Sequence, residues 1–185
     1  YSIANAPNAD GIVELCIVRH ALGHGTTYLF EEVVKGSVLT FKGPEGSFVL
    51  PQNPQDINLI MVCTGTGIAP FRSMIMDVIN RQQPFKKIHL IFGARKEEDI
   101  LYRQEMEKLS KTHPNFQYDV CLSQQPDWPG YKGYVHQVYL EKYTHVQTEN
   151  LFYLCGWTKM IDEAVANLIT GMGYDKSQIK YELYG

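Results

Sequence analysis

The fold is decided by one stretch of the sequence, Leu59-Ile60-Met61-Val62-Cys63-Thr64-Gly65-Thr66-Gly67-Ile68-Ala69-Pro70. It begins with a short apolar run, which is typical of a strand buried on both faces. The glycines that follow favour a tight turn, and Pro70 suits the first turn of a helix, where its missing N–H is not needed. The stretch therefore predicts a strand, a glycine turn and a helix, which together begin a βαβ pattern.

The same alternation continues to the C-terminus. Further strands are expected at 88–92, 118–122, 151–155 and 179–183, and helices at 69–80, 98–110, 135–142 and 159–171. With the strand at 59–63 this predicts a five-stranded, doubly wound parallel sheet, an α/β nucleotide-binding domain. Such sheets bind ligands beyond the carboxyl ends of their strands, so the residues after each strand should carry the chemistry.

The turn after the first of these strands has the chemistry of a phosphate site. Glycines let the backbone approach a pyrophosphate, and a helix start supplies free N–H groups with a partial positive charge. A lone G-x-G is more often a simple turn, but here a strand precedes it and a helix follows it. We therefore expect Thr64, Gly65, Thr66, Gly67 and Pro70 to contact a nucleotide. Pro70 replaces the last glycine of G-x-G-x-x-G, which argues against the most familiar dehydrogenase variant.

The N-terminal part of the chain has a different pattern. Short alternating runs at 11–19 and 37–42 are separated by Gly and Pro turn signals, which is typical of an antiparallel sheet, and one short helix is expected at 26–33. The change of pattern falls near Pro51-Gln52-Asn53-Pro54. We therefore expect two domains, residues 1–53 and residues 54–185.

The composition excludes several classes of protein. Hydrophobic residues make up 44% and charged residues 20%, an ordinary globular balance. The net charge of −3 offers no basic field for nucleic acid. The longest apolar runs are far shorter than the ~20 residues of a membrane-spanning helix, so no membrane span is expected.

The spacing of the cysteines and the residues at the N-terminus bear on the cellular compartment and on metal binding. The four cysteines are widely scattered, with no metal-binding or iron–sulfur spacing, which favours a reducing compartment and a cytoplasmic protein. His20 and His24 lack a third ligand, so no metal site is expected. The chain begins without Met and without a signal peptide, and we interpret its start as a cut end.

Five motifs stand in order along the whole chain: Tyr1-Ser2-Ile3-Ala4-Asn5-Ala6-Pro7, Gly43-Pro44-Glu45-Gly46-Ser47-Phe48, Gly65 to Pro70, Cys155-Gly156-Trp157 and Tyr181-Glu182-Leu183-Tyr184. In this order and spacing they resemble the ferredoxin-NADP reductase superfamily. The resemblance implies an antiparallel flavin-binding β-barrel, of which this chain holds the C-terminal part, followed by the nucleotide domain. It also implies FAD and NAD(P)H as cofactors.

The resemblance implies flavin contacts near the N-terminus. Tyr1 and Ser2 match an R-x-Y-S motif, in which the aromatic ring packs on the flavin and the Ser hydroxyl bonds near its N5. Gly25, Thr26 and Thr27 belong to a segment that resembles G-x-x-S, which holds the flavin pyrophosphate. From the residues alone, this segment is equally a loop and helix cap. The turn at 43–47 is at least as well explained by structure as by ligand contact.

The resemblance also implies the reacting residues. Cys155 and Gly156 match a C-G motif whose thiol lies beside the nicotinamide C4, although a buried strand cysteine is the ordinary alternative. Glu182 and Tyr184 match a C-terminal E-x-Y, with the carboxylate in the polar set of the active site and the ring over the flavin. Gly185 makes this tyrosine penultimate.

The implied catalytic set is therefore Ser2, Cys155, Glu182 and Tyr184. Gly156, Trp157 and Tyr184 are expected to contact cofactors as well.

The choice between NADH and NADPH rests on the ends of the second and third strands. Arg95 favours a 2′-phosphate, but three acidic residues follow at 97–99. Relatives that use NADPH often have S-R after the third strand, whereas Ser123 is followed here by Gln124. Lys132 and Tyr134 retain a later basic and aromatic pair. Without the Arg a bidentate phosphate partner is missing, which favours NADH.

The implied function is a flavin-dependent oxidoreductase, which passes a hydride from NAD(P)H to FAD and single electrons to an acceptor protein, either ferredoxin-like or an oxygenase component. A second interpretation is a nucleotide-binding electron-transfer subunit without independent turnover, held in a larger complex. Exposed apolar surface at an incomplete barrel would favour it. The earlier barrel strands are expected to be truncated, unresolved or supplied by another chain.

Overall fold

The computed structural model describes residues 1–43 and 45–184. Within them, a single sheet of parallel strands runs in the order β4-β3-β2-β1-β5-β6. Its strands are β1 (Asn58–Thr64), β2 (Lys87–Ala94), β3 (Phe116–Leu122), β4 (Tyr131–Lys132), β5 (Asn150–Trp157) and β6 (Ile179–Tyr184). The expected doubly wound sheet is confirmed, but with six strands rather than five among the described residues. The extra strand, β4, has two residues, too few to stand out as an apolar run.

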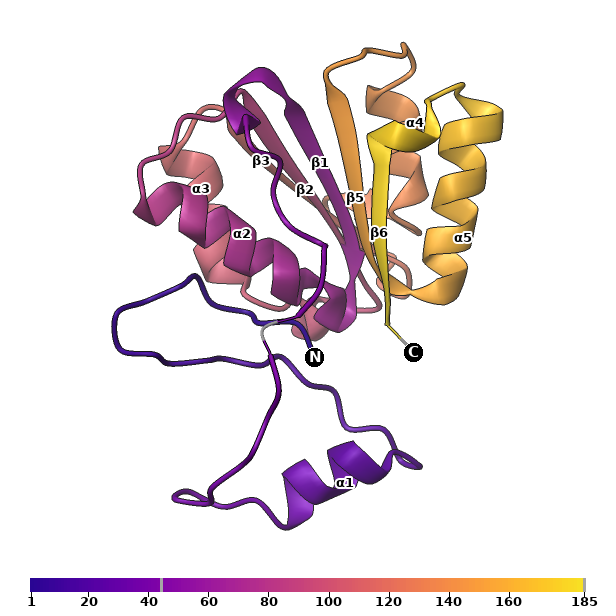
Figure 1. The fold of residues 1–185 in the computed structure, drawn as a ribbon. Helices are drawn as coiled ribbons and strands as arrows, with labels where there is room; N and C mark the ends of the chain where they lie inside the picture. The colour runs from indigo at the N-terminus through magenta and orange to yellow at the C-terminus, as the bar shows by residue number, and fades with distance from the viewer. Residues whose placement is uncertain (44, 185) are drawn as a thin grey trace.

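Helices cover both faces of the sheet (Figure 1). On one face, α2 (Ile68–Asn80) and α3 (Arg103–Thr112) bury Phe71, Ile75 and Met106 against the strands. On the other, α4 (His136–Lys142) and α5 (Thr158–Ala166), which continues as a π-helical turn Asn167–Gly171, bury residues such as Tyr139 and Ile161. Short 3-10 segments span Pro54–Asp56, Gly65–Gly67, Glu97–Asp99 and Lys176–Gln178. No helix in the described ranges has the length and apolar character needed to cross a membrane.

The order of the strands indicates where a ligand would bind. From β1 the chain adds β2, β3 and β4 on one side and then returns to place β5 and β6 on the other. The direction of winding therefore reverses between β1 and β5. In open α/β sheets, ligands bind at this switch point, outside the carboxyl ends of the two strands.

Two glycines let the backbones at this switch point approach each other closely. A Cβ on Gly67 would lie 2.3 Å from the carbonyl oxygen of Cys155, and a Cβ on Gly156 would lie 2.4 Å from Oγ1 of Thr64. Gly156 also has a φ of +135°, which side-chain-bearing residues rarely adopt. The turn after β1 is thus held against the end of β5 because both positions are glycine.

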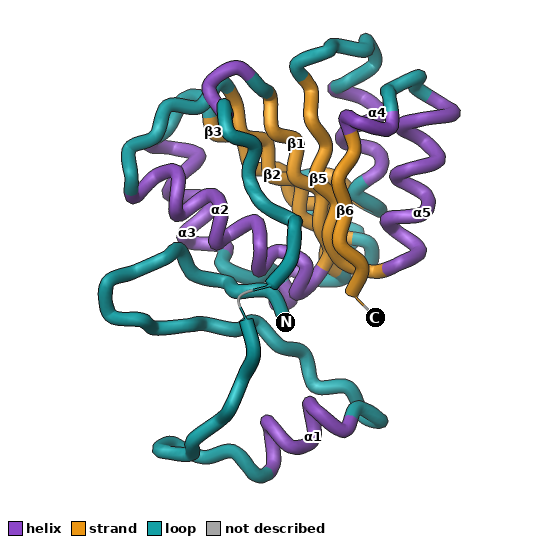
Figure 2. Tube along the Cα trace, in the orientation of Figure 1, coloured by secondary structure: helices purple, strands orange, loops and turns teal. Residues whose placement is uncertain are grey.

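The expectation of an antiparallel barrel portion in residues 1–53 is wrong for this structure. In this region the described residues form α1 (His24–Glu31), near the helix expected at 26–33, and one antiparallel bridge between Ile3 and Leu15. The rest is loop (Figure 2). Among the described residues, no neighbouring strand supplies hydrogen-bond partners to the runs at 11–19 and 37–42, so these runs form no ladder there. Pro44 of the expected turn at 43–47, and the terminal Gly185, lie outside the described residues.

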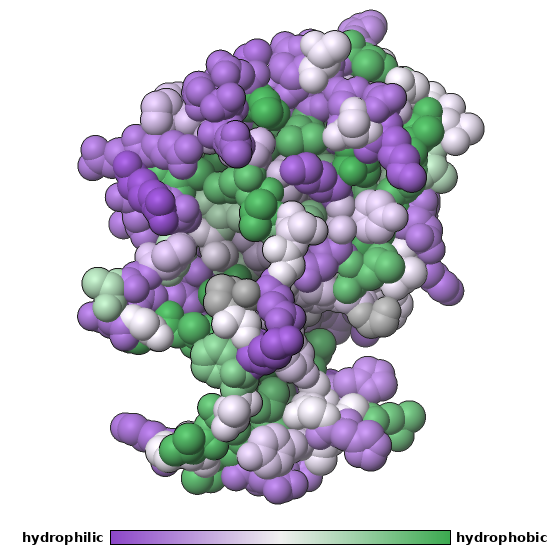
Figure 3. All heavy atoms as spheres, viewed as in Figure 1, coloured by the Kyte–Doolittle hydropathy of each residue, from purple (hydrophilic) through white to green (hydrophobic). Residues whose placement is uncertain are grey.

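Apolar side chains in this region face outward. Green, apolar atoms gather around α1 in Figure 3. From residue 12 to residue 49, the exposed large apolar residues are Ile12, Val13, Leu15, Val18, Leu22, Tyr28, Phe30, Val34, Val38, Leu39, Phe41 and Val49. A folded monomer rarely leaves so much apolar surface in one segment uncovered.

The segment that leads into the sheet is well anchored. The ring of Phe48 lies 5.2 Å from the ring of Tyr153 and 5.9 Å from that of Phe71. The Tyr153 hydroxyl donates a hydrogen bond to the carbonyl of Val49 at 2.8 Å. Residues 48 and 49 therefore belong to the layer that α2 forms on the sheet.

A buried histidine lies between the sheet and the segment after α4. The His89 side chain is fully buried, with Nδ1 2.7 Å from the Tyr143 hydroxyl and Nε2 2.8 Å from the Asp119 carboxylate. Lys142 lies 3.2 Å from the same carboxylate. Burial lowers the pKa of His89 below its ordinary 6.5, against the opposing pull of Asp119.

We expect Gly67→Ala to lower the free energy of unfolding by about 1–3 kcal/mol, because the new methyl group meets backbone atoms that cannot rotate away. Chemical denaturation measures this. Gly171→Ala is the matched control, since a Cβ there meets nothing within 4 Å. Equal stability of the Gly67→Ala variant and the wild type would contradict the close approach.

We expect the free energy of unfolding to fall as the pH drops from about 7.5 to about 5.5. His89 has a lower pKa folded than unfolded, so below about 6.5 the unfolded chain binds the extra proton and gains stability. His89→Gln should flatten this pH dependence, whereas His145→Gln, at an exposed position, should not. Denaturation curves across that pH range give the answer, and an unchanged slope in His89→Gln would count against it.

Candidate functional site

The candidate site lies at the carboxyl ends of β1, β5 and β6. Thr64 ends β1, and the Gly65–Gly67 turn leads directly into α2, with Pro70 buried in its first turn. Gly65 is exposed and has a φ of +52°. The first N–H groups of a helix have no intrahelical partner, so this turn offers donors and a positive dipole end to an anion.

Thr64 ties the turn to β5. Its Oγ1 accepts a hydrogen bond from the backbone N–H of Trp157 at 3.3 Å. Gly156 stands between Cys155 and Trp157 and turns the chain outward, so that the Trp157 side chain is 65% exposed. The threonine thereby fixes the direction in which the chain leaves β5 above the glycine turn.

The four residues expected to be catalytic lie together. Cys155 of β5 and Glu182 of β6 are register partners in adjacent parallel strands, so their side chains share one face of the sheet. The Ser2 hydroxyl donates to Oε1 of Glu182 at 3.3 Å, across 180 positions of sequence. The Tyr184 hydroxyl is buried and makes no well-formed hydrogen bond with the described residues.

Burial keeps two of these groups protonated. It raises the pKa of the Cys155 thiol to about 12, with the Glu182 carboxylate adding to the effect. Burial likewise raises the pKa of Tyr184 well above its ordinary range, although the nearby Ser2 opposes this in part. At neutral pH the cluster therefore holds a neutral thiol and a neutral phenol next to a carboxylate.

Arg95, Ser123, Lys132 and Tyr134 lie in a second group, at the carboxyl ends of β2, β3 and β4. The N–H and the hydroxyl of Ser123 both donate to the carbonyl of Ala94, at 3.1 and 3.4 Å. The Tyr134 ring is 70% exposed. These residues line the same edge of the sheet as the glycine turn, farther from β5.

A carboxylate stands in this second group. The Glu97 N–H donates to Oε1 of Gln125 at 2.7 Å, and the Glu97 carboxylate is paired with Arg103. Gln124, the residue after Ser123, is exposed. The Gln124 N–H donates to the carbonyl of Arg95 at 2.9 Å, so a neutral residue contacts Arg95, and the Glu97 carboxylate follows two positions along the chain.

The two segments expected to contact a flavin also meet. A Cβ on Gly25 would lie 3.9 Å from the Tyr1 hydroxyl, so the N-terminus lies beside the start of α1. Thr26, however, is buried, and its hydroxyl bonds to the carbonyls of Gly23 and His20 at 3.0 and 3.2 Å. In this structure Thr26 serves its own helix start. Thr27 is half-buried and donates its N–H to the carbonyl of Gly23.

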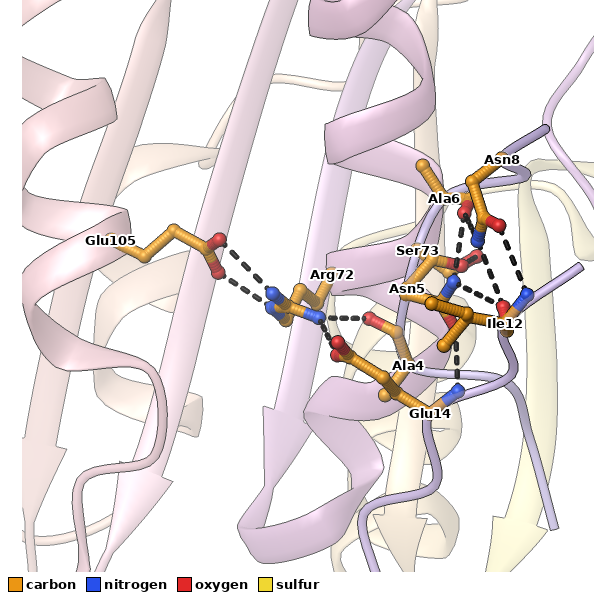
Figure 4. A network of polar contacts seen from close by, with 9 residues as sticks. All are labelled: Ala4, Asn5, Ala6, Asn8, Ile12, Glu14, Arg72, Ser73 and Glu105. Atoms are coloured by element: carbon orange, nitrogen blue, oxygen red, sulfur yellow. Dashed lines mark hydrogen bonds and ion pairs between the residues drawn. The ribbon is translucent and has the colours of Figure 1, made fainter. Parts of the chain in front are cut away.

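The sequence reasoning missed the residues that hold the N-terminal segment on α2, which are Asn5, Glu14, Arg72, Ser73 and Glu105 (Figure 4). Arg72 in an amphipathic helix looks like an ordinary exposed side chain. Its partners lie 68, 58 and 33 positions away. No local pattern signals contacts at such separations.

The comparisons with known proteins agree with this geometry. Residues 61–166 match the family model for the oxidoreductase NAD-binding domain. The chain is 33% identical to the phenol hydroxylase P5 protein of Acinetobacter pittii, covering 95% of this chain and 50% of that protein. It is 30% identical to the reductase component of phenol 2-monooxygenase from Pseudomonas sp. strain CF600, covering 100% of this chain and 52% of that protein. The chain thus spans about half the length of these curated relatives.

A solved structure extends the likeness. The chain superposes on a ferredoxin NADP+ reductase from Neisseria gonorrhoeae, crystallised with bound FAD and NADP, with a TM-score of 0.78 and 26% identity. The match covers 99% of this chain and 78% of that one. The resemblance to the ferredoxin-NADP reductase superfamily is confirmed, and the chain belongs to the family of oxidoreductase NAD-binding domains.

Proposed function

We propose that this chain is the nucleotide-binding part of a flavin-dependent NAD(P)H oxidoreductase. Residues 54–185 form the nucleotide domain, and residues 1–53 belong to the flavin domain. The contact between Ser2 and Glu182 carries the proposal. It joins a residue from the motif that resembles a flavin site to a residue beside the Cys155 thiol at the switch point of the nucleotide-binding sheet.

The nucleotide would bind along the carboxyl edge of the sheet. Gly65 and Gly67 let the backbone approach the pyrophosphate, and the start of α2 supplies N–H donors. Arg95, Ser123, Lys132 and Tyr134 stand where the adenosine half would reach, and Trp157 borders the nicotinamide end. Gly65 supports this assignment, since an added Cβ there would meet nothing within 4 Å and the turn therefore has open space beside it.

The N-terminal segment fits a flavin in part. Tyr1 is 71% exposed and lies beside Gly25, so its ring is free to stack on an isoalloxazine. The Thr26 hydroxyl is engaged with its own backbone, so Gly25 and Thr27 are better placed than Thr26 to meet a phosphate. A bound flavin would supply an acceptor for the nicotinamide hydride and a donor of single electrons.

The residues at the switch point would control the approach of the two rings. Cys155 presents a neutral thiol, which would fill space beside the nicotinamide and help to exclude water. Glu182 accepts the Ser2 hydroxyl proton at 3.3 Å, which leaves the hydroxyl oxygen free to accept a hydrogen bond from a flavin N–H. Tyr184 covers the site with an uncharged ring. Orientation of this kind dominates such reactions, because the reacting atoms must come to about 3–3.5 Å.

The electron acceptor is proposed from the relatives. One is the P5 protein of a phenol hydroxylase, another is the reductase component of a phenol monooxygenase, and the superposed structure is a ferredoxin NADP+ reductase. We propose a protein acceptor, either ferredoxin-like or an oxygenase component.

The exposed apolar side chains of residues 12–49 favour a second function, that of a non-autonomous electron-transfer subunit within a larger complex. Reduction of ferricyanide by the purified chain with added FAD and NADH separates the two. Turnover supports an independent reductase, and no turnover in a folded chain supports the dependent subunit.

We expect Cys155→Ser in the flavin-loaded full-length protein to slow flavin reduction in single-turnover experiments by about tenfold or more, or roughly 1.4 kcal/mol of barrier. The Kd for the nucleotide should change by less than about threefold. A hydroxyl is smaller and more polar than the thiol and leaves the nicotinamide less confined. Cys121→Ser, at a buried position on β3, is the matched control. An unchanged rate would remove Cys155 from the reacting set, and a wild-type flavin that neither NADH nor NADPH reduces would overturn the proposed function.

We expect kcat/KM to favour NADH over NADPH, because the Glu97 carboxylate and the neutral Gln124 offer no partner to a 2′-phosphate. Gln124→Arg should shift the ratio toward NADPH by about tenfold or more through a bidentate contact. Gln147→Arg is the control, since this exposed glutamine precedes β5 at the opposite edge of the sheet. Steady-state kinetics with both nucleotides decides, and a wild-type preference for NADPH above about tenfold would reverse the assignment.

A further inference from the structure

The N-terminal segment closes on itself between residues 3 and 15. Ile3 and Leu15 form an antiparallel bridge, and the N–H of Ala4 donates to the carbonyl of Glu14 at 2.8 Å. The N–H of Glu14 donates in turn to Oδ1 of Asn5 at 2.7 Å. We call residues 3–15 the N-terminal loop. These internal hydrogen bonds tie the two ends of the loop together. A contact that fixes one end therefore restrains the position of the other end.

Two consecutive residues of α2 hold two consecutive carbonyls of this loop (Figure 4). Nη1 of Arg72 donates to the carbonyl of Ala4 at 2.7 Å, and Oγ of Ser73 donates to the carbonyl of Asn5 at 2.8 Å. Nη1 of Arg72 also donates to the Glu14 carboxylate at 2.9 Å. Both ends of the N-terminal loop are therefore attached to α2.

Arg72 is itself held in place by α3 and the residue before it. Its Nε and Nη2 donate to the two oxygens of Glu105 at 2.6 and 3.1 Å, a forked pairing that fixes the plane of the guanidinium. The guanidinium carbon lies 4.5 Å from the centre of the Tyr102 ring. The side chain is only 15% exposed, and its hydrogen bonds to Glu105 raise its pKa. The Arg72 side chain is thus charged and held in one orientation, unlike the side chain of a mobile surface arginine.

The hydrogen bond from Arg72 to the Ala4 carbonyl determines where Ser2 lies. Ser2 stands two residues before Ala4, and an extended chain covers at most about 3.3–3.6 Å per residue, so an anchored Ala4 confines Ser2 to within about 7 Å. Ala4 is fully buried and cannot drift. The helix that carries Arg72 also begins at the glycine turn, so one rigid element carries both the nucleotide turn and the anchor of Ser2.

We propose that Arg72 and Ser73 are positioning residues, which act through the backbone of Ala4 and Asn5 to hold Ser2 against Glu182. This role rests on the proposed function, because its consequence is the alignment of the flavin side with the nicotinamide side. Arg72 does its work without contact with the reacting atoms. Its loss should therefore affect the rate of hydride transfer more than nucleotide binding.

Amide hydrogen exchange in the cofactor-free protein tests the anchor by itself. In Arg72→Met and in Ser73→Ala, the amides of Ala4 and Glu14 should exchange about tenfold faster or more, while those of β1 and β5 stay protected. Arg81→Met is the matched control, since this arginine at the end of the same helix is 63% exposed and pairs with Asp77 one turn away. Unchanged exchange at Ala4 and Glu14 in both variants would overturn the proposal.

Single-turnover reduction of the flavin-loaded full-length protein by NADH tests the consequence. Arg72→Met should reduce its flavin about tenfold more slowly or worse, with the nucleotide Kd within about threefold of wild type. Arg72→Lys should recover part of the rate, because an ammonium can still donate to the Ala4 carbonyl but loses the fork to Glu105. If Arg72→Met does not fold, Ser73→Ala and Arg72→Lys carry the test.

The outcomes separate the two levels of inference. A wild-type protein that reduces its flavin while all variants do so equally fast contradicts the positioning role and leaves the proposed function intact. A parallel loss of rate and nucleotide affinity in the milder variants also contradicts it, since a merely structural role predicts that pattern. A wild-type flavin that neither nucleotide reduces overturns the proposed function, and the positioning role with it.

Discussion

The arrangement of the site depends on one close approach, between the turn after β1 and the end of β5. A Cβ on Gly67 would overlap backbone atoms of Cys155, so only glycine permits the turn after β1 to lie this close to the end of β5. This approach sets the start of α2, the height of the Cys155 thiol above the turn and the outward path of Trp157. A side chain at either glycine would have to push apart β1 and β5, which share a ladder of main-chain hydrogen bonds. The arrangement at the switch point is thereby set by close contacts of the backbone at Gly67 and Gly156.

Burial then determines the charge states of the cysteines near the switch point. Free cysteine loses its proton more easily than Cys155 does here, since burial and the neighbouring Glu182 raise its pKa to about 12. Cys63, its register partner on β1, has its pKa raised as well, mainly by burial. The carboxylate of Glu182 is the negative group that acts on Cys155, and Ser2 donates to it. A thiol held neutral in this way is a poor nucleophile, because the thiolate is the reactive form.

Local pattern predicted most of the nucleotide domain. The apolar runs indicated the five longer strands, and the glycine turn between a strand and a helix indicated the crevice, because both depend on near neighbours in sequence. β4 was missed because two residues make no pattern. The antiparallel sheet expected from the runs at 11–19 and 37–42 is wrong for the described residues, since a strand exists only when a partner supplies its hydrogen bonds. Arg72 was missed for the converse reason, since its importance comes from partners remote in sequence.

The two parts of the N-terminal region differ in whether their backbone and apolar groups find partners in the nucleotide domain. Residues 3–15 are ordered against the nucleotide domain because Arg72 and Ser73 satisfy their carbonyls and Ala4 is buried. Residues 18–41 carry apolar side chains that remain exposed, such as Val18 and Val38. Exposed apolar surface of this extent is typical of an interface. The anchored loop holds Ser2 at Glu182 through its own contacts with α2, which do not involve residues 18–41.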